Sequence, residues 1–440
     1  MNKAIVELAL FSLPIILGQL SQMLIGTGDT LVAGRISTEA LGAIGVANGV
    51  ISPVLVMGFG FLAGLSPLLS KKRGQGVELE RLLPSTLLYS LMVSMVFFLL
   101  SLLLLSISDY LGIAPVLLPL VKKYLTFYIW SFWGAYIYMG LKEFLQAKEQ
   151  TIFANSLALG MVALNISVNF LLVFGYHWVP ALGFVGIPIA SIIIRTLMAI
   201  IMITVILRRS GWRLQGEIDY QFIKEAFKLS YPIAFTIVLE VAAFGLISLF
   251  IGQINSLEAA AHNIAITLAG VAFMIPLGMA SAVAVKVGHA YGRQSLADLR
   301  GLINANYVLT TIIMSLLALI FITLAPALSS LFSPEQSVVT LATKLLLIIA
   351  IFQLADGLHV TQAGVLRGLG VTRAPFIVSL LCYGALSIPL GLFLGHHQGM
   401  GAQGFWISLA LALNLAGISL FVILRLTMKR VCQYFPSVKL

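Results

Sequence analysis

Charged side chains are scarce in this chain of 440 residues. They make up 10% of it, whereas a soluble domain of average composition carries about 25%. Hydrophobic residues make up 60%. A fold surrounded by water cannot hide so much apolar surface, but a bilayer accepts it. This composition excludes a water-soluble enzyme, a disordered scaffold and a collagen-like protein.

Cysteine and catalytic motifs are also scarce. The two cysteines, Cys382 and Cys432, provide neither a disulfide framework nor a metal-binding spacing. The sequence has no GxxxxGK[ST] loop and no HExxH motif. The chain also opens without a small-residue cleavage site, so we expect its first helix to be retained. We therefore predict that the protein is not an enzyme, has no cofactor, and draws the energy for any transport from an ion gradient.

Long apolar stretches dominate what is present. A helix needs about 20 apolar residues to cross the hydrocarbon core of a bilayer. Twelve such stretches predict an all-α polytopic membrane protein. They lie near 8–32, 45–69, 86–108, 123–146, 154–175, 184–207, 227–251, 262–287, 303–330, 340–366, 375–395 and 402–425.

The basic residues indicate an orientation. The chain holds 26 Lys and Arg against 16 Asp and Glu, a net charge of +10. Most of the Lys and Arg residues fall in the loops on one side of the membrane, where we place Lys142 and Lys148. The loops on the other side hold only Arg35, Lys122, Lys123 and Lys344. This bias predicts cytoplasmic termini. It accounts for the charge through topology and lipid headgroups, so we expect no nucleic acid partner.

The two halves of the sequence repeat at an offset of 218 residues. Pro14 aligns with Pro232 and Gly34 with Gly252, since both pairs differ by 218 in number. We predict a first lobe over 1–207, a cytoplasmic linker over 208–226 and a second lobe over 227–440. Six helices in each lobe make the repeats parallel. Two such bundles around a central cleft are typical of a carrier that works by alternating access.

Polar residues inside the spans of the first half mark one candidate site, because ionisable groups in the hydrocarbon region are costly. Asp29 lies near the outer end of the first span. Asn165 and Asn169 share a helix face at a spacing of four residues, and Ser191 lies at a compatible depth. One carboxylate with amide and hydroxyl oxygens suits a hard cation or a protonatable Asp. The sequence does not separate these two, and Asp29 could also simply reach the outer surface.

The second half differs, because Glu240 and Asp356 both lie near the predicted bilayer midplane. Two carboxylates at one depth point to a role in cation or cargo binding, although each could instead pair with an amide for packing. Arg195 lies too deep in the sixth span to reach the interface, so we expect it to pair with a carboxylate or with helix carbonyls. Pro14 lies inside the first span and is a candidate hinge, since proline removes a helix hydrogen bond.

Several segments together resemble the multidrug and toxic compound extrusion (MATE) transporters, in their NorM-like bacterial branch. They are Gly28-Asp29-Thr30, Ala260-Ala261-His262-Asn263, Met274-Ile275-Pro276-Leu277, Val287-Gly288-His289-Ala290-Tyr291-Gly292 and Gln362-Ala363-Gly364-Val365-Leu366-Arg367-Gly368. Their order and spacing cover both halves of the chain.

The resemblance implies export of cationic or amphipathic compounds in exchange for H⁺ or Na⁺. It assigns Asp29, Asn165, Asn169 and Ser191 to a cation site in the first lobe, and the first three would ligate Na⁺ if that is the ion. It assigns Glu240 and Asp356 to the second lobe, where Phe352 replaces a family tyrosine and lacks its oxygen. We expect a monomer in the cytoplasmic membrane of a bacterium and favour the first lobe for ion coupling.

Two other functions stay open. A flippase for a lipid-linked substrate would share the architecture, but it should place more basic residues along its cavity. Here three intramembrane acids accompany one Arg, which favours cationic cargo. A passive channel or a membrane scaffold would need neither the repeat nor the buried acids.

Overall fold

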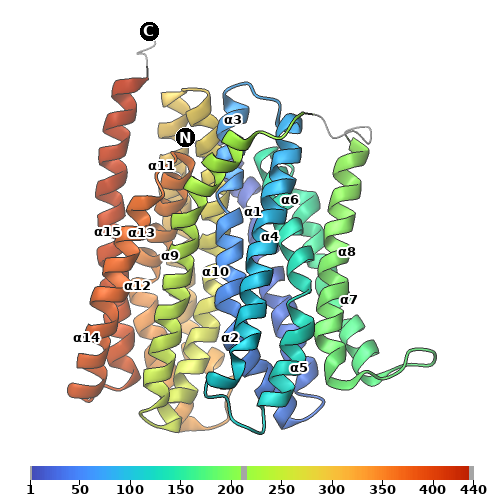
Figure 1. Ribbon diagram of the computed structural model, residues 1–440. Coiled ribbons are helices and arrows are strands. Elements are labelled where there is room, and N and C mark those ends of the chain that lie inside the picture. Colours follow the sequence, from blue (N-terminus) through green and yellow to red (C-terminus); the bar gives the residue numbers. More distant parts are fainter. Residues whose placement is uncertain (1, 210–215, 436–440) are drawn as a thin grey trace. The chain divides into compact units, whose positions relative to one another are not determined.

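The computed structural model describes residues 2–209 and 216–435, and over these residues the chain forms helices and no strand longer than a single bridge. The N-terminal half contains α1 (Asn2–Ala33), α2 (Thr38–Leu62), α3 (Leu65–Gly74), α4 (Leu83–Ser106), α5 (Leu118–Tyr128), α6 (Ser131–Ala147), α7 (Thr151–Phe174) and α8 (Gly186–Arg209). Short 3₁₀ turns cover Leu79–Leu82, Ser108–Tyr110 and Gly183–Val185 (Figure 1).

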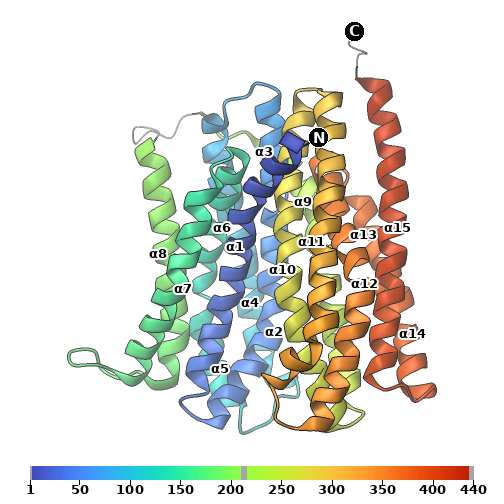
Figure 2. The same cartoon turned by 180° about the vertical axis from the view of Figure 1, so that it is seen from behind.

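The C-terminal half contains α9 (Tyr220–Gly252), α10 (Ser256–Gly292), α11 (Leu296–Ser330), α12 (Gln336–Gly368), α13 (Arg373–Ser379), α14 (Ile388–Leu392) and α15 (Ala402–Tyr434). The π-helical stretch Leu380–Ser387 joins α13 to α14, and a second one, Phe393–His397, follows α14, so that Arg373–His397 is one continuous span (Figure 2).

All twelve predicted spans correspond to helices. Eleven helical segments within the described ranges are long and apolar enough to cross a membrane. The remaining span, predicted at 123–146, consists of α5 and α6, which are separated by Ile129 and Trp130. The second predicted span is likewise divided, into α2 and α3. The prediction of an all-α polytopic fold is confirmed.

Two compact units make up the chain, and each contains part of the other half's first helix. Unit 1 comprises Met1–Ile16 with Phe235–Leu440, and unit 2 comprises Leu17–Ala234. The boundaries therefore lie inside α1 and α9 rather than in the predicted linker, part of which falls outside the described residues. Ile16 and Ala234 are related by the repeat, since 234 minus 16 is 218. Each boundary follows two residues after a proline of its helix, Pro14 or Pro232.

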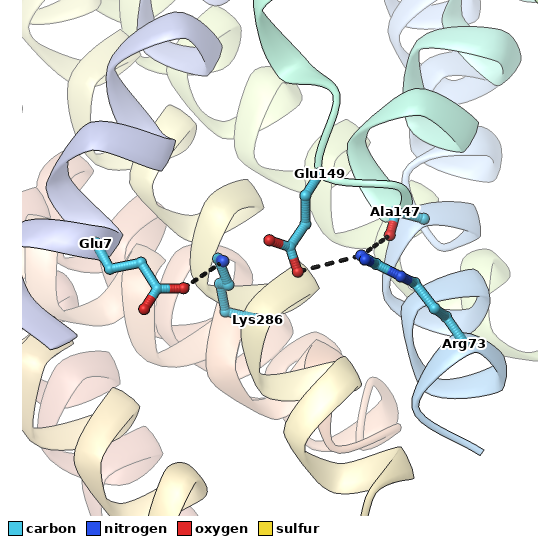
Figure 3. Close-up of polar contacts among 5 residues, drawn as sticks. All are labelled: Glu7, Arg73, Ala147, Glu149 and Lys286. Atoms are coloured by element: carbon cyan, nitrogen blue, oxygen red, sulfur yellow. Dashed lines mark hydrogen bonds and ion pairs between the residues drawn. The ribbon is translucent and has the colours of Figure 1, made fainter. Parts of the chain in front are cut away.

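An ion pair fixes the first segment of α1 within unit 1. The Lys286 ammonium on α10 lies 2.7 Å from Glu7 and 4.9 Å from the centre of the Phe11 ring (Figure 3). Gly278 of the same helix packs against Ile16 so closely that a Cβ there would lie 2.8 Å from the Ile16 Cα. The first segment of α1 is therefore held by charge and by close packing.

The first segment of α9 is fixed within unit 2 in the same way. Glu225 pairs with Lys72 of α3 at 3.0 Å, and the Ala234 Cα lies 2.4 Å from where a Cβ on Gly60 would stand. Glu7 and Glu225 also differ by 218 in number, so equivalent carboxylates hold the two exchanged segments.

Candidate functional site

The four polar residues predicted for the first lobe meet inside unit 2. Asp29 comes from α1, Asn165 and Asn169 from α7, and Ser191 from α8. The buried stripe of α7 carries both asparagines because they are one turn apart. Asp29 is 3% exposed, and the other three side chains are fully buried. We call these four residues the outer cluster, after the side of the membrane on which the sequence predicts them.

Both carboxylate oxygens of Asp29 accept hydrogen bonds. Asn169 Nδ2 donates to Oδ1 at 2.8 Å, and Ser191 Oγ donates to Oδ2 at 2.8 Å. Asn169 Nδ2 also lies 3.2 Å from Asn165 Oδ1. A buried carboxylate is stabilised by such donors, and hydrogen bonds to an ionised group are about twice as strong as neutral ones. The outer cluster is thus arranged around a carboxylate that two donors hold in place.

Hydrogen-bonding capacity remains in the outer cluster. Within the described residues, Asn165 Nδ2 and Asn169 Oδ1 are buried without a hydrogen-bond partner, and so is the Tyr124 hydroxyl on neighbouring α5. Buried polar atoms normally have partners. One donor, one acceptor and one hydroxyl at a carboxylate provide the groups that a water molecule or a small cation would use.

Arg195 lies one helical turn beyond Ser191 on α8, but its partners differ from those expected. Its guanidinium donates to the Tyr128 hydroxyl at 2.7 Å and to Ser131 Oγ at 2.9 Å, and it stands 4.9 Å from the centre of the Tyr128 ring. These partners flank the break between α5 and α6. They are hydroxyls, not the carboxylate or helix carbonyls that the sequence led us to expect.

The two carboxylates predicted for the second lobe both belong to unit 1. Glu240 lies on α9 and Asp356 on α12, and the two charges are close enough to act on each other. Arg367, three turns further along α12, also acts on Glu240. Neither acid is fully buried. Two acids so close together make this region suited to a cationic group.

A family model named MatE matches residues 14–171 and 232–393. The two matched ranges cover most of the chain and correspond to the two sequence repeats. The chain belongs to the MatE family. The multi-pass membrane architecture of MatE proteins agrees with the helices described above.

Individual MatE relatives align along nearly the whole chain. The multidrug resistance protein NorM of Photobacterium profundum is 27% identical over 95% of this chain and 94% of its own length. A probable NorM of Xylella fastidiosa is 29% identical over 97% of this chain and 93% of its own length. Among solved structures, the bent form of the MATE transporter VcmN of Vibrio cholerae covers 99% of both chains with a TM-score of 0.86 at 19% identity. The last comparison concerns the fold alone.

Phe352, which the resemblance places at a family tyrosine position, is part of a buried aromatic group in this MatE protein. It is 4% exposed and stacks on Trp406 with ring centres 6.3 Å apart. Trp406 Nε1 donates to His262 Nδ1 at 3.2 Å, and the other ring nitrogen of His262 lies 2.8 Å from Ser248 Oγ. The contacts of Phe352 are those of a packing residue that helps join α12, α15 and α10.

One position assigned from the sequence was wrong. We placed Lys142 in a loop, but it lies within α6 and its side chain is fully buried, beside the buried Glu143. A charge count along the sequence treats any lysine near the end of a span as a loop residue. Its burial depends on helices from other parts of the chain that pack against α6, which the sequence does not show locally.

Proposed function

We propose that this MatE family member is a secondary active antiporter. It exports cationic or amphipathic compounds in exchange for H⁺, or less favourably Na⁺, by alternating access. The observation that carries this proposal is Asp29, an acid buried in the span α1 and held by donors from α7 and α8. An ionisable group in such a place is expensive to keep, and in membrane transporters it marks an ion pathway.

The hydrogen-bond directions at Asp29 favour a proton as the coupling ion. Asn169 and Ser191 present an N–H and an O–H to the carboxylate. Sodium is bound by oxygen atoms, as are other hard cations, so Na⁺ would require the Asn169 amide to turn its oxygen towards the site. A proton needs no such rearrangement, because it binds to the carboxylate itself.

The cargo side of the proposal rests on unit 1. Glu240 and Asp356 supply negative charge inside the spans, and the curated relatives NorM and MdtK are named multidrug resistance proteins. An exporter must bind ion and cargo so that each opposes the other, because coupling between two sites is a reciprocal free energy. Glu240 and Asp356 in unit 1, together with Asp29 in unit 2, provide the two sites that such coupling requires.

Efflux from proteoliposomes with one ion gradient imposed at a time tests the proposal. The wild type should export a cationic dye when a pH gradient is present. With the same gradient, Asp29→Asn should export the dye no faster than the wild type does without a gradient. Asp109→Asn is a matched control, because this acid of unit 2 pairs with Lys122 at the exposed end of a helix. Equal gradient dependence in the wild type and in Asp29→Asn would refute the assignment to Asp29. Dye flux that ignores every gradient would indicate a passive channel.

A further inference from the structure

A second group of buried polar residues lies at the other end of unit 2. It consists of Ser66 and Ser70 on α3, Lys142, Glu143 and Gln146 on α6, and Asn155 on α7, and we call it the inner cluster. Each of the six side chains is at most 4% exposed. Lys and Glu are almost never fully buried unless they are paired. The inner cluster therefore needs an explanation beyond packing.

The hydrogen bonds of the inner cluster are incomplete. Glu143 accepts a short hydrogen bond from Ser66, and its other oxygen lies 3.5 Å from Gln146 Nε2. Among the described residues, four of its buried atoms have no hydrogen-bond partner: the Lys142 ammonium, Gln146 Oε1, Ser70 Oγ and Asn155 Oδ1. The ammonium offers three donors, and the others offer acceptors. Water molecules that bridge such atoms are a regular part of protein interiors.

The charges of the inner cluster restrict what it can bind. Glu143 is the charged group that acts on Lys142. Two further ion pairs lie near this end of α6, Arg73 with Glu149 at 3.2 Å (Figure 3) and Lys148 with Glu80 at 2.5 Å. Lys142 disfavours a metal cation and Glu143 disfavours an anion. Water, and a proton carried by it, remain.

The inner and outer clusters lie on the same face of α7. The buried stripe of this helix contains Asn155, Asn165 and Asn169, with the apolar Ala158 and Met161 between them. Ten residues separate Asn155 from Asn165, which is about 15 Å at 1.5 Å per residue. Gly18 of α1 packs against Asn155, and Asp29 follows eleven residues later on the same helix. Two helices thus link both clusters, and an apolar stretch separates them.

We propose that the inner cluster is a second proton site, which holds water and exchanges the coupling proton on the cytoplasmic side of unit 2. A hydronium ion transfers a proton to one carboxylate oxygen of Glu143, which leaves water and the neutral acid, and the acid later returns the proton to a water molecule as hydronium. The Lys142 ammonium favours release of the proton by attracting the carboxylate form. The apolar stretch between the clusters prevents a continuous proton leak. This proposal rests on proton-coupled antiport as the function.

Three variants test the site in proteoliposomes. Glu143→Gln removes the proton acceptor, Lys142→Met removes the ammonium, and the double variant removes both charges. Two rates are compared: dye exchange without any gradient, and dye efflux driven by a pH gradient. We expect Glu143→Gln and the double variant to lose gradient-driven efflux about tenfold or more, as for loss of a proton-transfer group. Exchange without a gradient should stay near the wild-type rate. Glu149→Gln, an acid of the same helix end, is the control.

The double variant separates a functional pair from a structural one. Lys142 and Glu143 are buried opposite charges. Removing one of them leaves the other uncompensated, which is strongly destabilising, whereas replacing both by neutral residues is often harmless. If the pair only stabilises the fold, the double variant should regain gradient-driven efflux, and that result would overturn the proposal. So would wild-type coupling in Glu143→Gln.

Infrared difference spectra after a pH jump provide a second measurement that does not depend on transport. The wild type should show a carboxyl band that disappears in Glu143→Gln, and an unchanged band pattern would contradict the proposal. A wild type that ignores the pH gradient would instead refute proton antiport itself. Failure of the Glu143 site and failure of proton antiport therefore give different results.

Discussion

Replacing Ser191 by alanine should tighten the binding of the coupling proton. Ser191 Oγ donates one of the two hydrogen bonds to Asp29, at 2.8 Å, and the side chain is fully buried. The substitution removes this donor and adds no volume. The carboxylate then loses a partner that stabilises its charged, proton-free form.

The expected magnitude follows from the difference between two kinds of hydrogen bond. A bond to a charged group contributes about 1.5–3 kcal/mol and a neutral one about 0.5–1.5 kcal/mol. Loss of the Ser191 donor therefore disfavours the ionised Asp29 relative to the proton-bound acid by about 1–1.5 kcal/mol. Because 1.4 kcal/mol corresponds to a factor of ten, the apparent proton affinity should rise about 5- to 10-fold.

The assay is dye efflux from proteoliposomes over a series of pH values, and the half-maximal rate should move up by up to about one pH unit. Ser101→Ala is the control, because Ser101 is buried in the same unit and its hydroxyl bonds only to the Phe97 carbonyl of its own helix. The opposite shift would refute the reasoning. A lower apparent affinity for Na⁺ with no response to pH would show that the Ser191 oxygen serves as a sodium ligand.

Four further substitutions test the packing of α1, the acids of unit 1 and the orientation of the chain. Gly18→Ala should lower the free energy of unfolding by about 1–3 kcal/mol, because its Cβ would overlap a side chain of α7; Gly26→Ala, with nothing within 4 Å, is the control in thermal unfolding. Glu240→Gln and Asp356→Asn should each abolish export of cationic dyes while the protein still inserts and unfolds at the wild-type temperature, and wild-type export by both would exclude these acids from cargo binding. A single cysteine at Glu217, in the linker, should resist membrane-impermeant reagents added outside intact cells, and ready labelling would reverse the orientation.

The sequence was sufficient to predict the residues of the outer cluster, because their meeting depends mainly on their depth along each span and on the helix face that they share. Depth along each span follows from residue number, and a spacing of four places Asn165 and Asn169 on one face. Asp29 and Ser191 then meet them at the same depth. The positions of the spans followed in the same way from the length of each apolar stretch.

Features that depend on contacts between distant segments were beyond the sequence. The break between α5 and α6 places Tyr128 and Ser131 beside Arg195, but no proline or glycine at 129–130 announces that break. The burial of Lys142 depends on the packing of other helices against α6. Phe352 was interpreted by its place in a family pattern, whereas its stacking on Trp406 depends on α15.

The exchange of helix segments between the two halves has a consequence for biosynthesis. The segment that contains Glu7 and Ile16 is made early, yet Gly278 and Lys286, against which it packs, are made about 270 residues later. Unit 2 in turn stays incomplete until Ala234 has been made. A chain cut in the linker would yield two fragments that each lack a segment of their own unit and contain one belonging to the other. The two halves of this protein repeat in sequence but do not coincide with its two compact units. Unit 2 needs part of the second half, up to Ala234, and unit 1 cannot form until the second half has been made as well as the first.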